Sequence, residues 1–161
     1  MPTAQTPDSQ LINRSSPETD PALAAAITRV LRHGHTIDIT TTGRRTGLPR
    51  RIEIVFHSFD GRLYISGTPS PRTRAWLHNL RANPALTFHL KQLIKADLPA
   101  TAREITDPTE RHAVLTKVAQ VWRRDVEPME RFSPLIEVTI DGLDRIEPAT
   151  DGTVEPVDEQ G

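Results

Sequence analysis

Apolar residues alternate with polar ones where we predict strands, and they recur every three or four positions where we predict helices. Asp20 and Pro21 form a helix-start signal, and helical spacing continues until Gly34, so we predict a helix to about Arg32. Three stretches with a period of two follow, and the Asp60-Gly61 pair indicates a hairpin between the second and third. Their inward residues are Ile37, Ile39 and Thr41, then Ile52, Ile54 and Phe56, then Leu63 and Ile65.

The second half of the chain places two more helices among three more strands. A short helix around Trp76 is predicted to end at Asn83-Pro84, because a residue before proline disfavours helical backbone. Asp107-Pro108-Thr109-Glu110 combines an N-cap, a first-turn proline and a capping-box acid, so a longer helix should run to Trp122. The remaining strands are predicted over residues 86–91, 98–105 and 135–140. Six short strands joined by hairpins predict a mainly β fold of the α+β class: an antiparallel barrel with helices packed outside.

The two ends of the chain differ from its middle in composition. Residues 1–19 are rich in Pro, Ser, Thr and Gln and poor in apolar side chains, so we expect a flexible arm there. Residues 149–161 should form an acidic flexible tail, which leaves residues 20–148 as a single domain. The chain has no apolar run long enough to cross a membrane and no secretion signal at its start, so we expect a cytoplasmic protein without membrane contact.

Composition removes several kinds of chemistry. The absence of cysteine excludes disulfides, iron–sulfur clusters, thiolate nucleophiles and cysteine-ligated zinc. The sequence signatures of serine hydrolases, zinc proteases and Rossmann dehydrogenases are missing. His33 and His35 have no third ligand at a metal-binding spacing, so we expect no metal site. Aromatic residues make up only 4% of the chain, which leaves few platforms for stacking nucleic-acid bases and disfavours such a partner.

The net charge of −1 hides a strong asymmetry along the chain. Residues 41–91 contain nine cationic residues and two acidic ones, a local charge of +7, so the rest of the chain carries −8. A segment this basic indicates either an anionic ligand or solvated arginines on strand faces. The charge alone leaves both interpretations open.

Two turns carry most of this positive charge. The run from Thr41 to Arg51 has two glycines four positions apart and four arginines, which is typical of a cradle for an oxyanion or of a basic hairpin tip. The run from Gly67 to Leu80 places small and stiff residues and two arginines before a helix, whose first amides would favour an anion. We expect both turns to serve one pocket. The alternatives are core packing for Trp76 and a structural hydrogen bond for His78.

Several separated motifs together resemble the deazaflavin-dependent nitroreductase family, over roughly His35 to Ile140. They are Gly43-Arg44-Arg45-Thr46-Gly47, Arg50, Asp60-Gly61, Pro71-Arg72 with Trp76, His78-Asn79-Leu80 and Ala82-Asn83-Pro84. Members of this family are split β-barrel proteins that bind coenzyme F420, which carries a phosphodiester and an oligoglutamate tail. The resemblance implies an oxidoreductase that passes a hydride from reduced F420 to a small-molecule acceptor, such as a quinone or enone. There are two alternatives. One is a non-catalytic carrier of F420 or a flavin, and the other is an FMN-dependent oxidoreductase of the same fold.

The resemblance also implies which residues contact the cofactor, while no catalytic residue is assigned. Arg45 and Arg72 stand where the family usually has lysine, which keeps the charge but changes its geometry. Tyr64 is the only tyrosine, whereas nitro-reducing relatives carry tyrosine in their C-terminal region, so activity on nitro compounds is disfavoured. A homodimer is an open alternative. The predicted cofactor-binding residues are Arg44, Arg45, Thr46, Gly47, Arg50, Gly67, Thr68, Pro71, Arg72, Trp76, His78 and Asn79.

Overall fold

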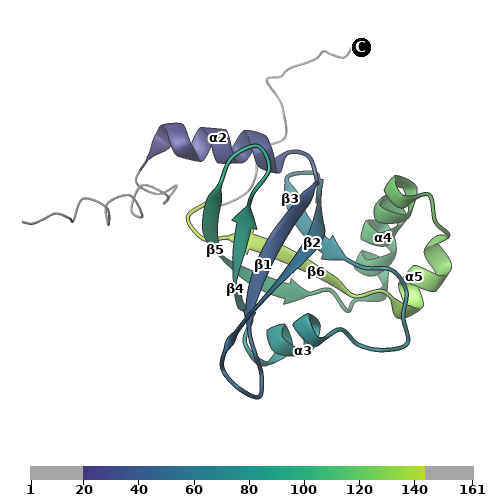
Figure 1. The fold of residues 1–161 in the computed structure, drawn as a ribbon. Coiled ribbons are helices and arrows are strands. Elements are labelled where there is room, and N and C mark those ends of the chain that lie inside the picture. Colours follow the sequence, from purple (N-terminus) through teal and green to yellow (C-terminus); the bar gives the residue numbers. More distant parts are fainter. Residues whose placement is uncertain (1–19, 144–161) are drawn as a thin grey trace, which may run out of the picture.

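Six antiparallel strands close into a barrel in the order β1-β2-β3-β6-β5-β4, which confirms the predicted fold (Figure 1). The computed structural model describes residues 20–143, so the predicted arm and acidic tail lie outside the described residues. The strands are β1 (Thr36–Thr42), β2 (Pro49–Phe59), β3 (Arg62–Ser66), β4 (Ala85–Leu90), β5 (Ala96–Glu104) and β6 (Leu135–Ile140).

The alternating sequence pattern sets which strand residues fill the barrel. On β1, Ile37 and Ile39 are fully buried while the residues between them are only half-buried. The β2–β3 hairpin turns at Asp60 and Gly61, whose φ angles are 54° and 77°. Positive φ at both central residues is the geometry that an Asp-Gly pair favours in a two-residue hairpin, as predicted.

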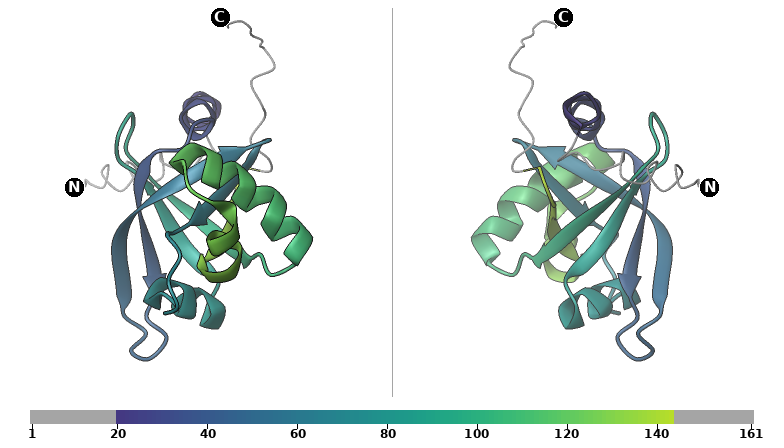
Figure 2. Two further views of the ribbon diagram at one scale, coloured as in Figure 1. Left: turned by 90° about the vertical axis from the view of Figure 1, so that its right-hand side faces the viewer. Right: turned by 90° about the vertical axis from the view of Figure 1, so that its left-hand side faces the viewer.

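Four helices surround the barrel among the described residues: α2 (Pro21–Leu31), α3 (Ala75–Ala82), α4 (Pro108–Trp122) and α5 (Val126–Phe132). The predicted caps are present, since the Asp20 carboxylate accepts from the amides of Ala22 and Leu23 and the Asp107 carboxylate accepts from the amide of Glu110. Helices α2 and α3 lie at opposite ends of the barrel, and α4 and α5 lie together on one side (Figures 1 and 2). No helix in residues 20–143 is long and apolar enough to cross a membrane.

Helix α5 is absent from the sequence-based expectation. Its N-cap residue Asp125 makes no side-chain capping bond, and Pro128 lies within its first turn. The helix instead depends on tertiary packing, because Met129 is fully buried against the α4 residues Leu115 and Val118. A seven-residue helix of this kind leaves almost no local signal in the sequence.

Helix α3 is fixed to the end of the barrel by apolar side chains. Trp76, Leu77 and Leu80 are all buried and belong to the same core cluster as the barrel residues Ile39 and Leu86. This packing holds α3 beside the β1–β2 turn, and the two lie together at the same end of the molecule in both views of Figure 2. The predicted cofactor-binding region is built on this contact.

Candidate cofactor-binding site

The β1–β2 turn is held by its own hydrogen bonds. The amide of Gly43 donates to the carbonyl of Leu48 at 2.8 Å, and the amide of Gly47 donates to the carbonyl of Gly43 at 2.8 Å. The hydroxyl of Thr46 accepts from the amide of Leu48 at 3.1 Å. Gly47 has φ of +73°, and a Cβ on Gly43 would lie 2.9 Å from the Thr46 hydroxyl, so the turn requires glycine at both positions.

Asn79 ties this turn to helix α3. Its Nδ2 donates to the hydroxyl of Thr41 at 3.1 Å, and its Oδ1 accepts from the backbone amide of Arg44 at 3.0 Å. Both Asn79 and Thr41 are buried. The bond to Thr41 is buried and the bond from Arg44 is partly buried, so Asn79 links the helix to the strand end and to the start of the turn.

A cavity of about 570 Å³ lies between the β1–β2 turn and α3. Among residues 20–143, Arg44, Arg45 and Arg50 have no carboxylate partner, and all three side chains are exposed. The residues that line the cavity are Thr41, Gly43, Arg44, Arg45, Thr46, Pro49, Arg50, Arg51, Ile52, Ala75, Trp76 and Asn79. Three cations without a counter-ion at one cavity are suited to a ligand that carries several negative charges.

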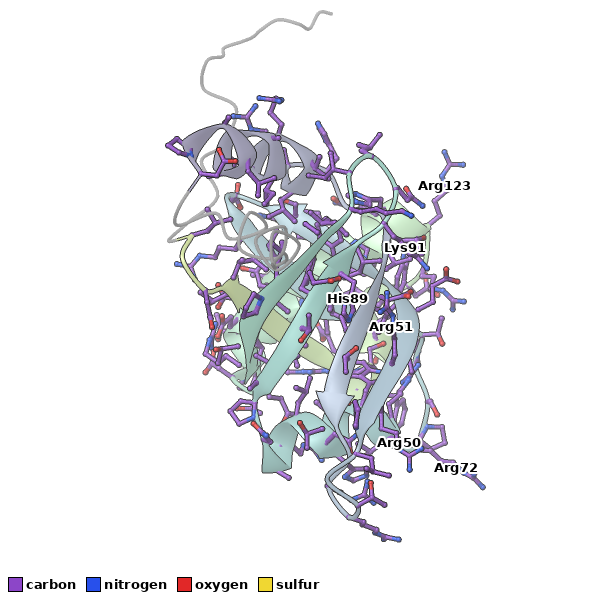
Figure 3. The ribbon with its side chains drawn as sticks, turned by 60° about the vertical axis from the view of Figure 1, so that its left-hand side comes forward. Arg50, Arg51, Arg72, His89, Lys91 and Arg123 are labelled. Atoms are coloured by element: carbon purple, nitrogen blue, oxygen red, sulfur yellow. The ribbon has the colours of Figure 1, made fainter. Side chains whose placement is uncertain are left out.

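Arg51 differs from the other three arginines of this turn. Its guanidinium is paired with the Asp38 carboxylate at 2.9 Å, and Lys91 contacts the same carboxylate at 2.6 Å. Hydrogen bonds from Lys91 and Arg51 lower the pKa of Asp38. Figure 3 shows Arg51 and Lys91 along the outer face of the strands, whereas Arg50 lies at the end of the barrel that carries α3. Arg51 is therefore already neutralised by the protein.

The second arginine-bearing turn does not share this cavity, so the expectation of one common pocket is wrong. Pro71 and Arg72 line a separate cavity of about 340 Å³. The cause is the packing of this turn toward α5, because the amide of Ser70 donates to the carbonyl of Phe132 at 3.1 Å. Arg50 and Arg72 still lie toward the same end of the barrel (Figure 3).

Helix α3 separates the two cavities. Ala75, Trp76 and Asn79 line the first cavity, and at about 100° per residue they share one face of the helix. Arg74, Leu77 and Arg81 line the second cavity from the opposite face. A helix only about 10–12 Å across thus divides a basic segment of the sequence into two sites.

The structure brings half of the predicted cofactor-binding residues to the first cavity. Trp76 belongs to the core and also lines this cavity, so its contact with the cofactor stays a prediction. Gly67 and Thr68 lie against Arg74 instead, whose guanidinium donates to the Thr68 carbonyl and hydroxyl. His78 is half-buried and lines neither cavity. The six predicted residues at the first cavity are Arg44, Arg45, Thr46, Arg50, Trp76 and Asn79.

The buried histidines and tyrosine of residues 20–143, which are His57, His89 and Tyr64, do not line the first cavity. His57 is buried between Phe59 and Trp122, and this burial lowers its pKa to about 4. Tyr64 packs in the core beneath α4, where burial raises its pKa. Among residues 20–143, no histidine, tyrosine or acidic residue lines the first cavity, so the described walls supply binding groups rather than a proton donor.

With this geometry established, comparison with known families is informative. The sequence model of the F420H(2)-dependent quinone reductases matches residues 13–138. The chain belongs to this family. As a member of the F420H(2)-dependent quinone reductase family, it is an F420-dependent oxidoreductase.

Solved structures similar to this family member share its fold. A conserved hypothetical protein from Mycobacterium tuberculosis is 18% identical, with a TM-score of 0.57 over 73% of this chain and 79% of that chain. General Stress Protein 26 from Bacillus anthracis is 20% identical, with a TM-score of 0.54 over 74% of this chain and 89% of that chain. An F420-H2 dependent reductase is 23% identical over 65% of this chain and 93% of that chain, with a TM-score of 0.47. The first two share the antiparallel barrel fold of this chain.

The donor set of the first cavity fits the coenzyme of the family. Coenzyme F420 carries a phosphodiester and several carboxylates, and guanidinium groups bind both in a bidentate manner. Arg44, Arg45 and Arg50 provide such groups without a competing carboxylate among residues 20–143. Ile52 and Trp76 add apolar surface at the same cavity.

Proposed function

We propose that this family member holds the anionic portion of coenzyme F420 in the cavity between the β1–β2 turn and α3, and reduces a small acceptor with an activated double bond, such as a quinone or enone. When bound, the reduced coenzyme supplies the hydride. The observation that carries the proposal is the set of three arginines, Arg44, Arg45 and Arg50, that face a cavity without an acidic partner in the described chain.

The protein contributes binding and orientation. Arg45 and Arg50 would contact phosphate and carboxylate groups, and Arg44 would add charge from the start of the turn. Ile52 and Trp76 offer apolar surface for the flat part of the ligand. Asn79 keeps the turn in place through its two hydrogen bonds, so the site is formed before the ligand arrives. Such preorganisation reduces the entropy cost of aligning coenzyme and acceptor.

The proton that accompanies reduction should come from solvent. In the part of the chain that the structure describes, the walls of the first cavity contain no imidazole, phenol or carboxyl group. We therefore expect no ionisation of a cavity side chain in the pH dependence of the rate near neutrality.

An absorbance titration with coenzyme F420 tests cofactor binding, with FMN as the competing ligand. Arg50→Gln should weaken F420 binding about tenfold, because one charge-assisted contact is worth about 1.4 kcal/mol or more. Arg29→Gln is the matched control, since Arg29 is exposed on α2 at the other end of the barrel. Tight FMN binding with no F420 binding would instead identify an FMN oxidoreductase of the same barrel type.

A non-catalytic carrier is the second candidate, favoured by the lack of a proton donor at the cavity. Stopped-flow oxidation of the reduced coenzyme with a panel of quinones and enones separates the two functions. An enzyme accelerates the oxidation by at least one acceptor. A carrier binds the coenzyme with the same affinity and leaves its oxidation rate at the uncatalysed value.

A further inference from the structure

The second cavity, between the 70–74 turn, α3, α4 and α5, is also rich in positive charge. Its walls include five arginines and only two glutamates, Glu104 and Glu130. Arg81 is neutralised there, because it binds Glu104 through two hydrogen bonds of 2.8 and 2.9 Å. Glu130 is engaged by the His112 imidazole on α4. The four other arginines form no ion pair among residues 20–143, although Glu104 and Glu130 both act electrostatically on Arg111.

Two of these arginines are held in place by neutral groups. Arg111 donates to the carbonyls of Ile105, Met129, Glu130 and Ser133 at 2.9–3.3 Å. Arg74 donates to the carbonyl and hydroxyl of Thr68. Burial lowers the pKa of both guanidinium groups. A desolvated cation that is bonded only to neutral oxygens gains free energy when an anion binds beside it.

A buried hydroxyl provides an independent sign of a missing ligand. Ser133 lines the cavity and is only 5% exposed, yet its hydroxyl has no hydrogen-bond partner among the described residues. Buried polar groups in folded proteins nearly always have a partner, so an orphaned one calls for an explanation. A ligand oxygen in this cavity would satisfy it.

We infer that the second cavity binds a small dianion, either a phosphate monoester or a dicarboxylate, between Arg74, Arg111 and Arg131 with a hydrogen bond to Ser133. The volume of about 340 Å³ suits a small molecule. Arg131 is exposed at the end of α5 and makes no ion pair in the described chain, so its guanidinium is available at the cavity mouth. This inference does not rest on the proposed function, because α3 separates the two cavities.

Calorimetric titration of the full chain with inorganic phosphate and with succinate, at constant ionic strength, tests the inference. We expect at least one of them to bind with a Kd of about 1 mM or tighter. The anion that binds more tightly identifies the ligand class. Arg131→Gln should weaken this binding about tenfold and Ser133→Ala about threefold, in line with a charged and a neutral hydrogen bond. Arg29→Gln, with the same loss of charge at the far end of the barrel, should change it less than about twofold.

Three outcomes would overturn the inference. The first is that neither anion binds at millimolar concentration. The second is that Arg131→Gln and Arg29→Gln weaken binding equally, which would indicate general electrostatics. The third is that Arg50→Gln abolishes binding while Arg131→Gln does not, which would place the anion in the first cavity. Coenzyme titration of Arg131→Gln distinguishes this inference from the proposed function. Its F420 affinity should be unchanged, and a loss would mean that the second cavity is part of the cofactor site.

Discussion

The two arginine-bearing turns look alike in the sequence and differ in the structure. In the β1–β2 turn, the backbone is held by glycine amides, the Thr46 hydroxyl and Asn79, and its arginines are left unpaired apart from Arg51. In the 70–74 turn, Arg74 is used to hold the backbone. Arg111, at the same cavity, likewise supports the ends of β5 and α5. The two regions therefore use their arginines differently: the side chains of those in the β1–β2 turn other than Arg51 make no bond that holds the fold among residues 20–143, whereas Arg74 and Arg111 support the backbone beside the cavity that they line.

The largest expected effect comes from replacing one arginine by methionine in each region and comparing the stability of the two variants. Arg111→Met removes four hydrogen bonds to carbonyls and leaves those carbonyls without a donor, so the free energy of unfolding should fall by about 3 kcal/mol. Arg50→Met should change it by less than about 0.5 kcal/mol, because Arg50 has no partner among the described residues. Urea unfolding of both variants measures this. Equal losses of unfolding free energy would mean that Arg50 and Arg111 support the fold to the same extent.

The next largest effect is expected at Asn79. Asn79→Leu leaves the buried Thr41 hydroxyl and the Arg44 amide without partners and should reduce the free energy of unfolding by about 2 kcal/mol. It should also weaken F420 binding, because the turn loses its brace. His78→Ala on the same helix is the control and should have little effect on either quantity. Unchanged coenzyme affinity in a folded Asn79→Leu variant would show that the turn needs no support from α3.

A smaller effect is expected inside the β1–β2 turn itself. Gly43→Ala places a methyl group 2.9 Å from the Thr46 hydroxyl and 3.1 Å from the Leu48 carbonyl, so the turn must shift at a cost of about 1–2 kcal/mol. Gly47→Ala has no atom within 4 Å of the added carbon, and only its φ of +73° costs about 1 kcal/mol. Thermal unfolding and coenzyme titration together measure these effects. We expect Gly43→Ala to weaken F420 binding more than Gly47→Ala does.

The smallest effect at neutral pH is expected at His57, a buried base without a ligand role. Its folded-state pKa of about 4 lies below the ordinary value of 6.5, so the unfolded chain binds more protons between these pH values. The contribution of His57 is therefore fully present above pH 6.5 and is lost as the pH falls toward 4. His57→Phe should match the parent at pH 7 and show a shallower loss of stability on acidification, measured by urea unfolding at several pH values. If the stability of both proteins fell in parallel with pH, the lowered pKa of His57 would be contradicted.

Much of the fold was predictable because its signals are local. Asp20 and Asp107 cap helices through residues two or three positions away, and Asp60-Gly61 sets its hairpin through its own φ angles. Helix α5 was missed because Met129 stabilises it through contacts with α4. Likewise, nothing near Arg111 in the sequence indicates that its guanidinium meets carbonyls on α5.

The sequence alone determined the order of the six strands and of helices α2, α3 and α4, the glycine-framed β1–β2 turn and the family resemblance, since these depend on residue types at short spacing. The tertiary structure decided which arginines remain unpaired and which cavity each one lines. That decision depends on where α3 and α5 pack, because the position of each guanidinium in space sets which carboxylates, carbonyls and cavities lie within its reach. Charge is a property of the sequence, but its availability to a ligand is a property of the fold.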